Sequence, residues 1–165
     1  MVLGFNKKFM NSLKVGDKAP DFVLMGNDGE KFTLKKALGK WLVLYFYPKD
    51  NTPGCTMEAC DFRDYSKEFS KVKALIWGIS TDSLESHKKF AERHHLPFPL
   101  LADTEKDVVE KYGVWKQKSM FGIKYLGVER TTFVIDPKGK IAHIFAKVKV
   151  SNHYEEVLNF ITENS

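Results

Sequence analysis

The chain has few of the features that identify a protein class at first sight. Among its 165 residues there are only two cysteines, Cys55 and Cys60, which are too few for a disulfide-stapled scaffold. No second cysteine pair and no histidine at zinc-site spacing accompanies them, so a structural metal site is not expected. No apolar run approaches the ~20 residues that cross a bilayer, and the longest, residues 41–47, has the length of a strand.

Arginine is also scarce. Of the 26 basic residues only Arg63, Arg93 and Arg130 are arginine, and the formal net charge is +5. The lysines are scattered singly or in pairs, without a run of five or more basic residues, which argues against nucleic-acid binding as the main function. We interpret the charge as a lysine-rich solvated surface, and expect neither nucleic acid nor membrane as a partner.

The remaining composition is that of a globular protein. Hydrophobic residues make up 43% of the chain and charged residues 28%. The length suits one domain, which can bury ~70% of its surface without disulfides. We expect residues 1–12 to be an N-terminal extension and residues 13–165 a single domain. The first residues lack the apolar segment and cleavage site of a secretory signal, so we expect a cytoplasmic protein.

The hydrophobic pattern of the first half predicts a hairpin followed by a βαβ unit. Residues 22–25 and 31–34 flank a glycine-containing turn, which is typical of a hairpin. Residues 41–47 and 74–79 are almost wholly apolar, as in strands buried on both faces of a parallel sheet. Between them, residues 53–69 carry apolar positions three or four apart and predict a helix.

The second half predicts further helices and a second hairpin. In chain order we expect a helix from Asp82 or Ser83 to His94, a short helix over 104–112, a loop or irregular edge over 116–127, a hairpin of 130–135 with 140–146, and a terminal helix from Ser151 or Asn152 to Ile161. Helices covering a mixed central sheet, with an N-terminal β-hairpin, make the fold α/β and thioredoxin-like.

The junction between the first buried strand and its helix carries the most informative chemistry. Thr52 is a good N-cap and Pro53 suits the first helical position, which makes Cys55 the third. Unpaired N–H groups and the helix dipole favour a thiolate there, whereas an ordinary thiol is only ~3% ionised at pH 7. We interpret Cys55 as a nucleophile or redox-active sulfur. From the residues alone it could also be a small core side chain, with Thr52 a plain cap and Pro48 a strand terminator.

A resemblance to a known family narrows this choice. Pro48, Thr52 and Cys55 match the peroxiredoxin motif Pro-x-x-x-Thr-x-x-Cys. The string KDNTPGCTMEACDFRD resembles the bacterioferritin comigratory protein, or peroxiredoxin Q, subgroup, in which a second cysteine follows five residues after the first. The resemblance extends to VGDKAPDFVL at 15–24, ERTTFVIDPKGKI at 129–141 and SNHYEEVL at 151–158.

The resemblance implies a role for each matching residue. Cys55 would be the peroxidatic cysteine and Cys60 the resolving one, Thr52 and Arg130 would activate the thiolate, and Pro48 would shield it. The enzyme would be a thioredoxin-dependent peroxiredoxin. It would reduce hydrogen peroxide and organic hydroperoxides through a sulfenic acid and an intrachain disulfide, and would serve antioxidant defence and redox homeostasis. The resemblance implies no cofactor and no metal, and a monomer or weak dimer.

Several alternatives stay open at this point. Cys60 could be a packing residue of a one-cysteine peroxidase, or both cysteines could belong to a redox sensor or holdase. A thioredoxin-type oxidoreductase is disfavoured because the chain has no Cys-x-x-Cys. Glu58 could orient partners at the helix start or be a solvated helix residue. If Cys55 and Cys60 share a regular helix, their Cα atoms lie ~8.7 Å apart, too far for a disulfide, so we expect residues 53–62 to unwind on oxidation.

Overall fold

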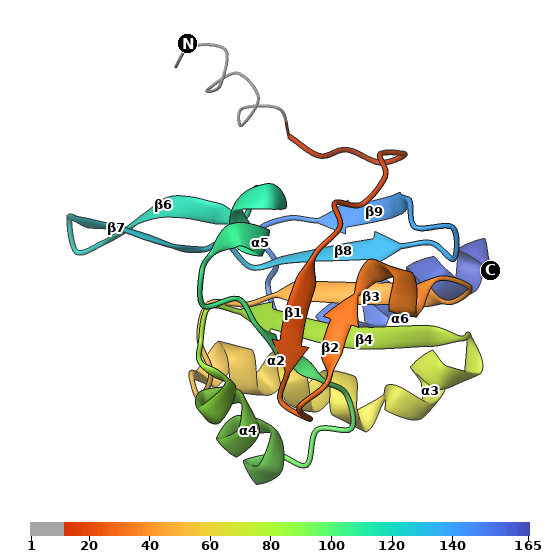
Figure 1. Ribbon diagram of the computed structural model, residues 1–165, viewed down its shortest axis with the longest axis horizontal. Coiled ribbons are helices and arrows are strands. Elements are labelled where there is room, and N and C mark those ends of the chain that lie inside the picture. The colour runs from red at the N-terminus through yellow and green to blue at the C-terminus, as the bar shows by residue number, and fades with distance from the viewer. Residues whose placement is uncertain (1–11) are drawn as a thin grey trace.

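The computed structural model describes residues 12–165 and has a seven-stranded mixed sheet at its centre (Figure 1). The expected N-terminal extension lies outside the described residues except for Ser12. Across the sheet the strands are β2 (Lys31–Thr33), β1 (Val23–Gly26), β5 (Leu100–Ala102), β4 (Ala74–Ser80), β3 (Trp41–Phe46), β8 (Thr131–Ile135) and β9 (Ile141–Phe145). Strands β3, β4 and β5 are parallel, and the other pairings are antiparallel.

Helices cover both faces of this sheet. On one face a hydrophobic core forms against α2 (Pro53–Asp64), α3 (Ser66–Lys71), α4 (Leu84–Arg93) and α6 (His153–Asn164). On the other face the core includes the short η1 (Leu34–Ala37) and α5 (Asp107–Lys111). No helix among residues 12–165 has both the length and the apolar character that crossing a membrane would require.

Strand β3 explains why both cores exist. Its side chains alternate between the two faces, because successive residues of a strand point in opposite directions. Leu42, Leu44 and Phe46 enter the core under η1 and α5, whereas Val43 and Tyr45 enter the core under α2. Every residue from Leu42 to Phe46 is fully buried, as the almost wholly apolar run predicts.

Much of the predicted element order is confirmed. The hairpin β1–β2, the parallel pair β3–β4 and the hairpin β8–β9 lie where the sequence indicates. Helix α4 begins after Ser83, whose side chain accepts a hydrogen bond from the Ser86 N–H as an N-cap does. The predicted helix over 53–69 is wrong in one respect: it is two helices, because Tyr65 leaves the helical conformation and its ring stacks on Tyr154 of α6.

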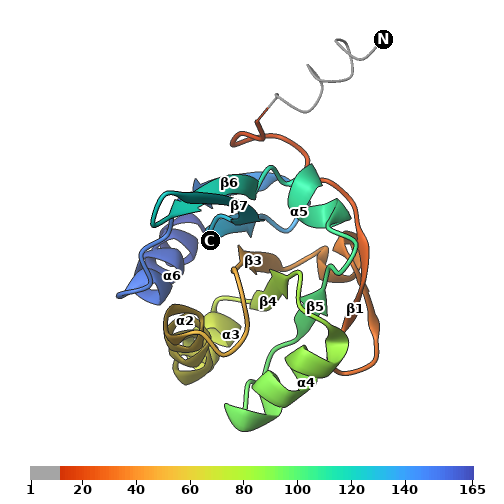
Figure 2. The same ribbon diagram turned by 90° about the vertical axis from the view of Figure 1, so that its left-hand side faces the viewer.

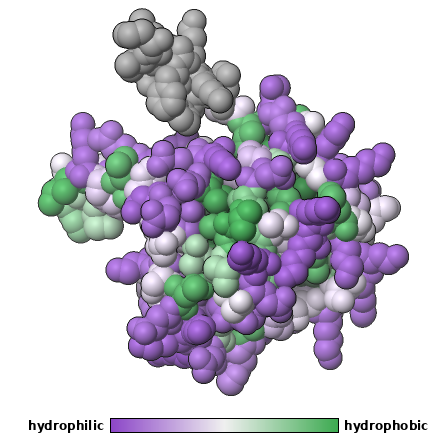
Figure 3. All heavy atoms as spheres, viewed as in Figure 1, coloured by the Kyte–Doolittle hydropathy of each residue, from purple (hydrophilic) through white to green (hydrophobic). Residues whose placement is uncertain are grey.

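The prediction of a loop or irregular edge over 116–127 is wrong. The segment forms an antiparallel hairpin of β6 (Trp115–Met120) and β7 (Ile123–Val128) that projects from the body (Figure 1). Its two-residue turn is Phe121-Gly122, with φ of 52° and 79°, the signs that a type I′ turn needs. The tip is hydrophobic and exposed (Figure 3). Because only the base of the hairpin, at Trp115 and Val128, contacts a core, the strands show no clean apolar period, and Phe-Gly is not the usual Asn-Gly signal.

Candidate active site

The residues of the peroxiredoxin-like motif lie where the chain passes from β3 into α2. Figure 2 looks onto this side of the molecule, with hairpin β6–β7 above α2. Pro48 is half-buried in the loop after β3, and Pro53 opens α2 as predicted. Cys55 therefore occupies the third position of α2, where backbone N–H groups have no partner inside the helix.

Thr52 holds the N-cap position but its side chain does not cap the helix. Its backbone is extended, with φ −88° and ψ 153°, as in an N-cap residue. Its hydroxyl instead donates a hydrogen bond of 2.8 Å to the Lys49 carbonyl oxygen. The expectation of a side-chain cap is thus wrong, because the hydroxyl turns back into the loop. The N–H groups of Gly54 and Cys55 remain open to an incoming anion.

Cys55 and Arg130 are in contact although 75 residues separate them in the chain. The Cys55 side chain is buried at 1% exposure, and its Sγ accepts a hydrogen bond of 3.3 Å from Nη2 of Arg130. Arg130 lies between β7 and β8, so the pairing of β8 beside β3 brings it to the start of α2. The contact places a fixed positive charge beside the sulfur.

Gly54 makes this approach possible. A Cβ at this position would come within 3.2 Å of Arg130 Nη2, which is closer than ordinary van der Waals contact allows. The absence of a side chain lets the guanidinium lie against the first turn of α2. The close approach of Arg130, and not a positive φ, is therefore the reason for glycine at this position.

Glu58 lies in the same cluster as Cys55 and Arg130, whereas the sequence leaves open whether it is a site residue or a solvated helix residue. It is buried at 1% exposure, and its Oε1 accepts from Arg130 Nη1 at 2.6 Å. The alternative of a solvated helix residue is therefore wrong. Burial raises the pKa of Glu58 to about 7, in spite of the opposing charge of Arg130. The sequence feature that points to Glu58 as a neighbour of Cys55 is spacing, because a residue three positions after Cys55 lies on the same helix face.

Arg130 thus bridges two acidic groups. Burial alone disfavours its charge, but Glu58 and then Cys55 hold the pKa of Arg130 above its usual value. Two buried atoms nearby, Glu58 Oε2 and the Tyr45 hydroxyl, have no hydrogen-bond partner among the described residues. Burial raises the pKa of Tyr45 as well, with the charges of Glu58 and Cys55 adding to the effect.

Cys60 lies later in α2 and contacts a different element. Its Sγ is 3.8 Å from Nδ1 of His94, the C-cap residue that follows α4, and Arg63 donates to the His94 carbonyl oxygen at 2.8 Å. Burial raises the pKa of the Cys60 thiol, which Arg63 partly offsets. Both cysteines are free thiols, and the structure does not bring them together.

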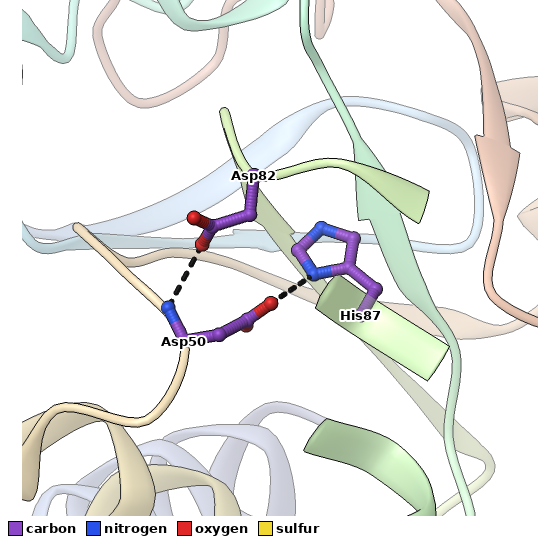
Figure 4. Close-up of side chains that lie close together, drawn as sticks. All are labelled: Asp50, Asp82 and His87. Carbon is purple, nitrogen blue, oxygen red and sulfur yellow. Dashed lines mark hydrogen bonds and ion pairs between the residues drawn. The ribbon is translucent and has the colours of Figure 1, made fainter. Parts of the chain in front are cut away.

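A third group of polar residues supports the loop that carries Thr52 (Figure 4). Asp50 and His87 are both buried, and Asp50 Oδ2 lies 2.7 Å from His87 Nδ1. The backbone N–H of Asp50 donates to Asp82 Oδ2 at 2.8 Å. These three side chains offer ligand atoms within 4.8 Å of one another, a spacing that a metal site also has. The sequence gives no signal for this group, since its members are far apart in the chain.

The chain is similar in sequence to known proteins. The profile of the AhpC/TSA family matches residues 15–144. Peroxiredoxin Bcp of Bacillus subtilis (strain 168) is 49% identical over 154 residues, 93% of this chain and 98% of the relative.

Solved structures agree with this similarity. A peroxiredoxin Q mutant of Xylella fastidiosa has a TM-score of 0.88 at 35% identity, covering 93% of this chain and 98% of its own. The bacterioferritin comigratory protein of Xanthomonas campestris, in a trapped intermediate/ligand complex that bears on its alkyl peroxide reduction activity, has a TM-score of 0.83 at 40% identity, covering 87% and 91%. These similarities confirm the predicted thioredoxin-like fold class.

Proposed function

Because the chain belongs to the AhpC/TSA family, as a thiol-dependent peroxidase of the Bcp or peroxiredoxin Q type, we propose that Cys55 is its peroxidatic cysteine and Cys60 its resolving cysteine. The observation that carries this proposal is the 3.3 Å contact of Arg130 with the buried Cys55 sulfur at the start of α2. Both features favour a thiolate, the form that attacks peroxide. The proposed substrates are hydrogen peroxide and organic hydroperoxides, the latter supported by the alkyl peroxide reduction of the Xanthomonas relative.

The peroxide step follows from the arrangement. The Cys55 thiolate attacks one peroxide oxygen, the S–O bond forms, and the O–O bond breaks. The sulfur is oxidised to a sulfenic acid, and the other oxygen leaves as hydroxide or alkoxide and takes up a proton. Negative charge moves from sulfur to the leaving oxygen, so fixed donors near that oxygen lower the barrier. Arg130 and the N–H groups of Gly54 and Cys55 are the proposed donors.

Thr52 has an acceptor role in this proposal. Its hydroxyl proton is already directed to the Lys49 carbonyl, so its oxygen is free to accept a hydrogen bond from the O–H of the peroxide. This contact would orient the peroxide without competing for the donors that stabilise the leaving oxygen. Pro48, half-buried at the start of the same loop, is proposed to limit access of water to the sulfur.

The second step needs a change of shape. On a regular helix the two Cα atoms lie ~8.7 Å apart with side chains ~140° apart, whereas a disulfide needs a separation within ~7 Å. We therefore propose that the start of α2 unwinds, so that Cys60 leaves His94 and attacks the sulfenic acid. A disulfide forms, water leaves, and a thioredoxin-type dithiol reduces the disulfide by exchange.

Two single substitutions test the assignment. Cys55→Ser should abolish both the first turnover with peroxide and steady-state consumption with thioredoxin, thioredoxin reductase and NADPH. Cys60→Ser should keep the first turnover, seen as one sulfenic acid per chain by a dimedone-type trap, and lose the steady state. Residual activity above ~1% in Cys55→Ser would contradict its role, since loss of a nucleophile costs at least ~10²-fold.

The same assay separates the rival functions. A one-cysteine peroxidase would keep its steady state in the Cys60→Ser variant with a small-molecule thiol and with thioredoxin alike. A redox sensor or holdase would form the disulfide but consume little peroxide at steady state. The partly buried position of Cys60 against His94, with a route to Cys55 only through unwinding of α2, favours the two-cysteine cycle.

The setting of the enzyme belongs to the proposal as well. Two free thiols that are recycled by a dithiol protein suit a reducing compartment, which supports the cytoplasm. We propose a monomer or weak dimer, because Cys55 and Cys60 belong to one helix and their disulfide needs no second subunit. Light scattering of the reduced protein across a concentration series measures this, and a stable larger assembly at micromolar concentration would contradict it.

A further inference from the structure

The loop that carries Thr52 is held by a buried side chain, His87, and the hydrogen-bond partners of His87 define its protonation. His87 of α4 is fully buried, and its two ring nitrogens face two different elements. Nδ1 lies 2.7 Å from Oδ2 of Asp50 in the loop, and Nε2 lies 3.0 Å from the Leu101 carbonyl oxygen in β5 (Figure 4 for Asp50 and His87). Each nitrogen is therefore within hydrogen-bond distance of an oxygen.

The nature of these oxygens fixes the protons. A carbonyl oxygen can only accept, so Nε2 of His87 must carry a proton to satisfy Leu101. An ionised carboxylate also only accepts, so Nδ1 must carry one too if Asp50 is ionised. A histidine with protons on both nitrogens is a cation.

The surroundings of Asp50 favour its ionised form. The hydroxyls of Tyr47 and Ser86 donate to its two oxygens at 2.6 and 2.8 Å. Burial alone would raise the pKa of Asp50, but the hydrogen bonds from His87, Tyr47 and Ser86 bring it below its usual value. Asp82, whose carboxylate accepts from the Asp50 N–H, is the further charged group beside the pair. The Tyr47 and Ser86 hydroxyls and the His87 ring all point at the Asp50 side chain, as donors do at a carboxylate.

We propose that His87 is a buried imidazolium and that its pair with Asp50 is a positioning device, a proposal that rests on the proposed function. The pair keeps the Thr52 loop in its peroxide-binding shape while α2 unwinds and refolds. Asp50 is two residues before Thr52, yet all its anchors lie outside α2. Its side chain is held by α4 and its N–H by Asp82 after β4. The loop is therefore tied to elements that the oxidation of α2 does not require to move.

The two charges of the pair compensate each other inside the protein. A buried carboxylate without a cation would be costly, and a buried imidazolium without an anion equally so. Each charge offsets the desolvation cost of the other. The remaining hydrogen-bond positions of the pair are filled by Tyr47, Ser86 and Leu101. Loss of either partner leaves a buried charge or an unfilled acceptor next to the loop. Both nitrogens of His87 are occupied in this way, so the three clustered side chains need no metal ion to be satisfied.

The direct test reads the protons of His87 without any peroxide. Reduced protein labelled with ¹⁵N-histidine gives long-range ¹H–¹⁵N spectra that distinguish a cation from either neutral tautomer, and His87→Gln assigns the signal. At pH 7 we expect both nitrogens protonated. In Asp50→Asn we expect only Nε2 to be protonated, because the amide can donate to Nδ1. A neutral His87 in the wild-type protein would overturn the proposal, whatever the outcome for the catalytic cysteines.

A kinetic test addresses positioning. Misplacement of a reacting group by ~1 Å can cost ~10²-fold, so His87→Gln and Asp50→Ala should slow sulfenic acid formation by about 10- to 100-fold. Asp50→Asn, which keeps the hydrogen bonds with a neutral His87, should stay within about threefold. Glu85→Gln, an exposed position on the same helix, is the matched control and should leave the rate unchanged. If folded His87→Gln retains the wild-type rate, the pair does not position the loop.

Discussion

At the residue scale, Arg130 is the group on which the site depends. It donates to the Cys55 sulfur through one nitrogen and to Glu58 through another, so its planar fork fixes both acids at once. A point charge on a flexible side chain could not satisfy both directions. The guanidinium should therefore contribute to the peroxide step through orientation as well as charge.

Replacing Arg130 by methionine tests this contribution. The loss of one fixed charge-assisted donor should raise the barrier by ~2–4 kcal/mol, which corresponds to a rate of sulfenic acid formation ~30- to 1,000-fold lower. Rapid mixing of the reduced protein with peroxide measures this rate. Arg93→Met removes an exposed arginine of α4 and should change nothing. A normal rate in the Arg130→Met protein would mean that the contact seen with Cys55 has no catalytic consequence.

Glu58 should make folding stability depend on pH near neutrality. Its pKa is raised from 4.5 to about 7 by burial, so the folded protein keeps a proton that the unfolded chain releases. Stability should fall as pH rises from about 4.5 to 7, by at most ~3 kcal/mol. Glu58→Gln removes the titrating group and keeps an acceptor for Arg130. Urea unfolding at pH 5 and pH 8 should show a smaller difference for this variant than for the wild type, and equal differences would refute the assignment.

At the scale of the element, α2 has to be both ordered and breakable. Cys55, Ala59 and Phe62 pack in the core against β3, which stabilises the reduced helix. Its first two residues, however, are Pro53 and Gly54, and its start has no side-chain cap and no acidic residue in the first turn. Both caps and acidic first-turn residues normally stabilise this end, so α2 begins weakly.

Hydrogen exchange should show this helix opening on oxidation. Amides of residues 53–62 should lose protection in the fully disulfide-bonded protein, because the two cysteines cannot meet on a regular helix. Amides of α4 should keep theirs, since this helix holds the Thr52 loop without taking part in the disulfide. Equal protection of 53–62 in both redox forms, or a disulfide found only between chains, would contradict the proposed cycle.

At the scale of the whole molecule, the two cores share one sheet and only one of them contains the site. Cys55 belongs to the core under α2, α3, α4 and α6, whereas the core under η1 and α5 lies on the opposite face of the sheet. Unwinding the start of α2 should therefore expose apolar surface on one face and leave the sheet and the opposite core intact. This arrangement allows a large local change without global unfolding.

Denaturant unfolding tests this division. The slope of unfolding free energy against denaturant scales with the surface that unfolding exposes. The disulfide-bonded protein has already exposed part of one core, so its slope should be smaller than that of the reduced protein. The midpoint is less informative, because the disulfide also restricts the unfolded chain. A Cys60→Ser protein treated with peroxide is the control, and its slope should match the reduced form.

The sequence by itself determined the local framework of the site. The apolar run of β3 predicts a strand buried on both faces, and Thr52 with Pro53 predicts the start of α2 and hence the place of Cys55. These are local properties, since a strand, an N-cap position and a proline at the first helical position depend on neighbouring residues. The hairpin β6–β7 is not predicted, because only Trp115 and Val128 at its base contact a core and the rest of its strands has no buried face to give it a period.

Only the tertiary structure decided which side chains meet at the site. Arg130 reaches Cys55 across 75 residues because β8 pairs with β3, and His87 reaches Asp50 across 37 residues because α4 packs beside the loop. Glu58 is buried for the same reason, since Arg130, directly before β8, covers it and pairs with it. Burial and partnership of a polar side chain depend on what the rest of the chain places over it. The spacing of Glu58 from Cys55 places both on one helix face but indicates neither burial nor a partner, so these properties appear only once the sheet is assembled.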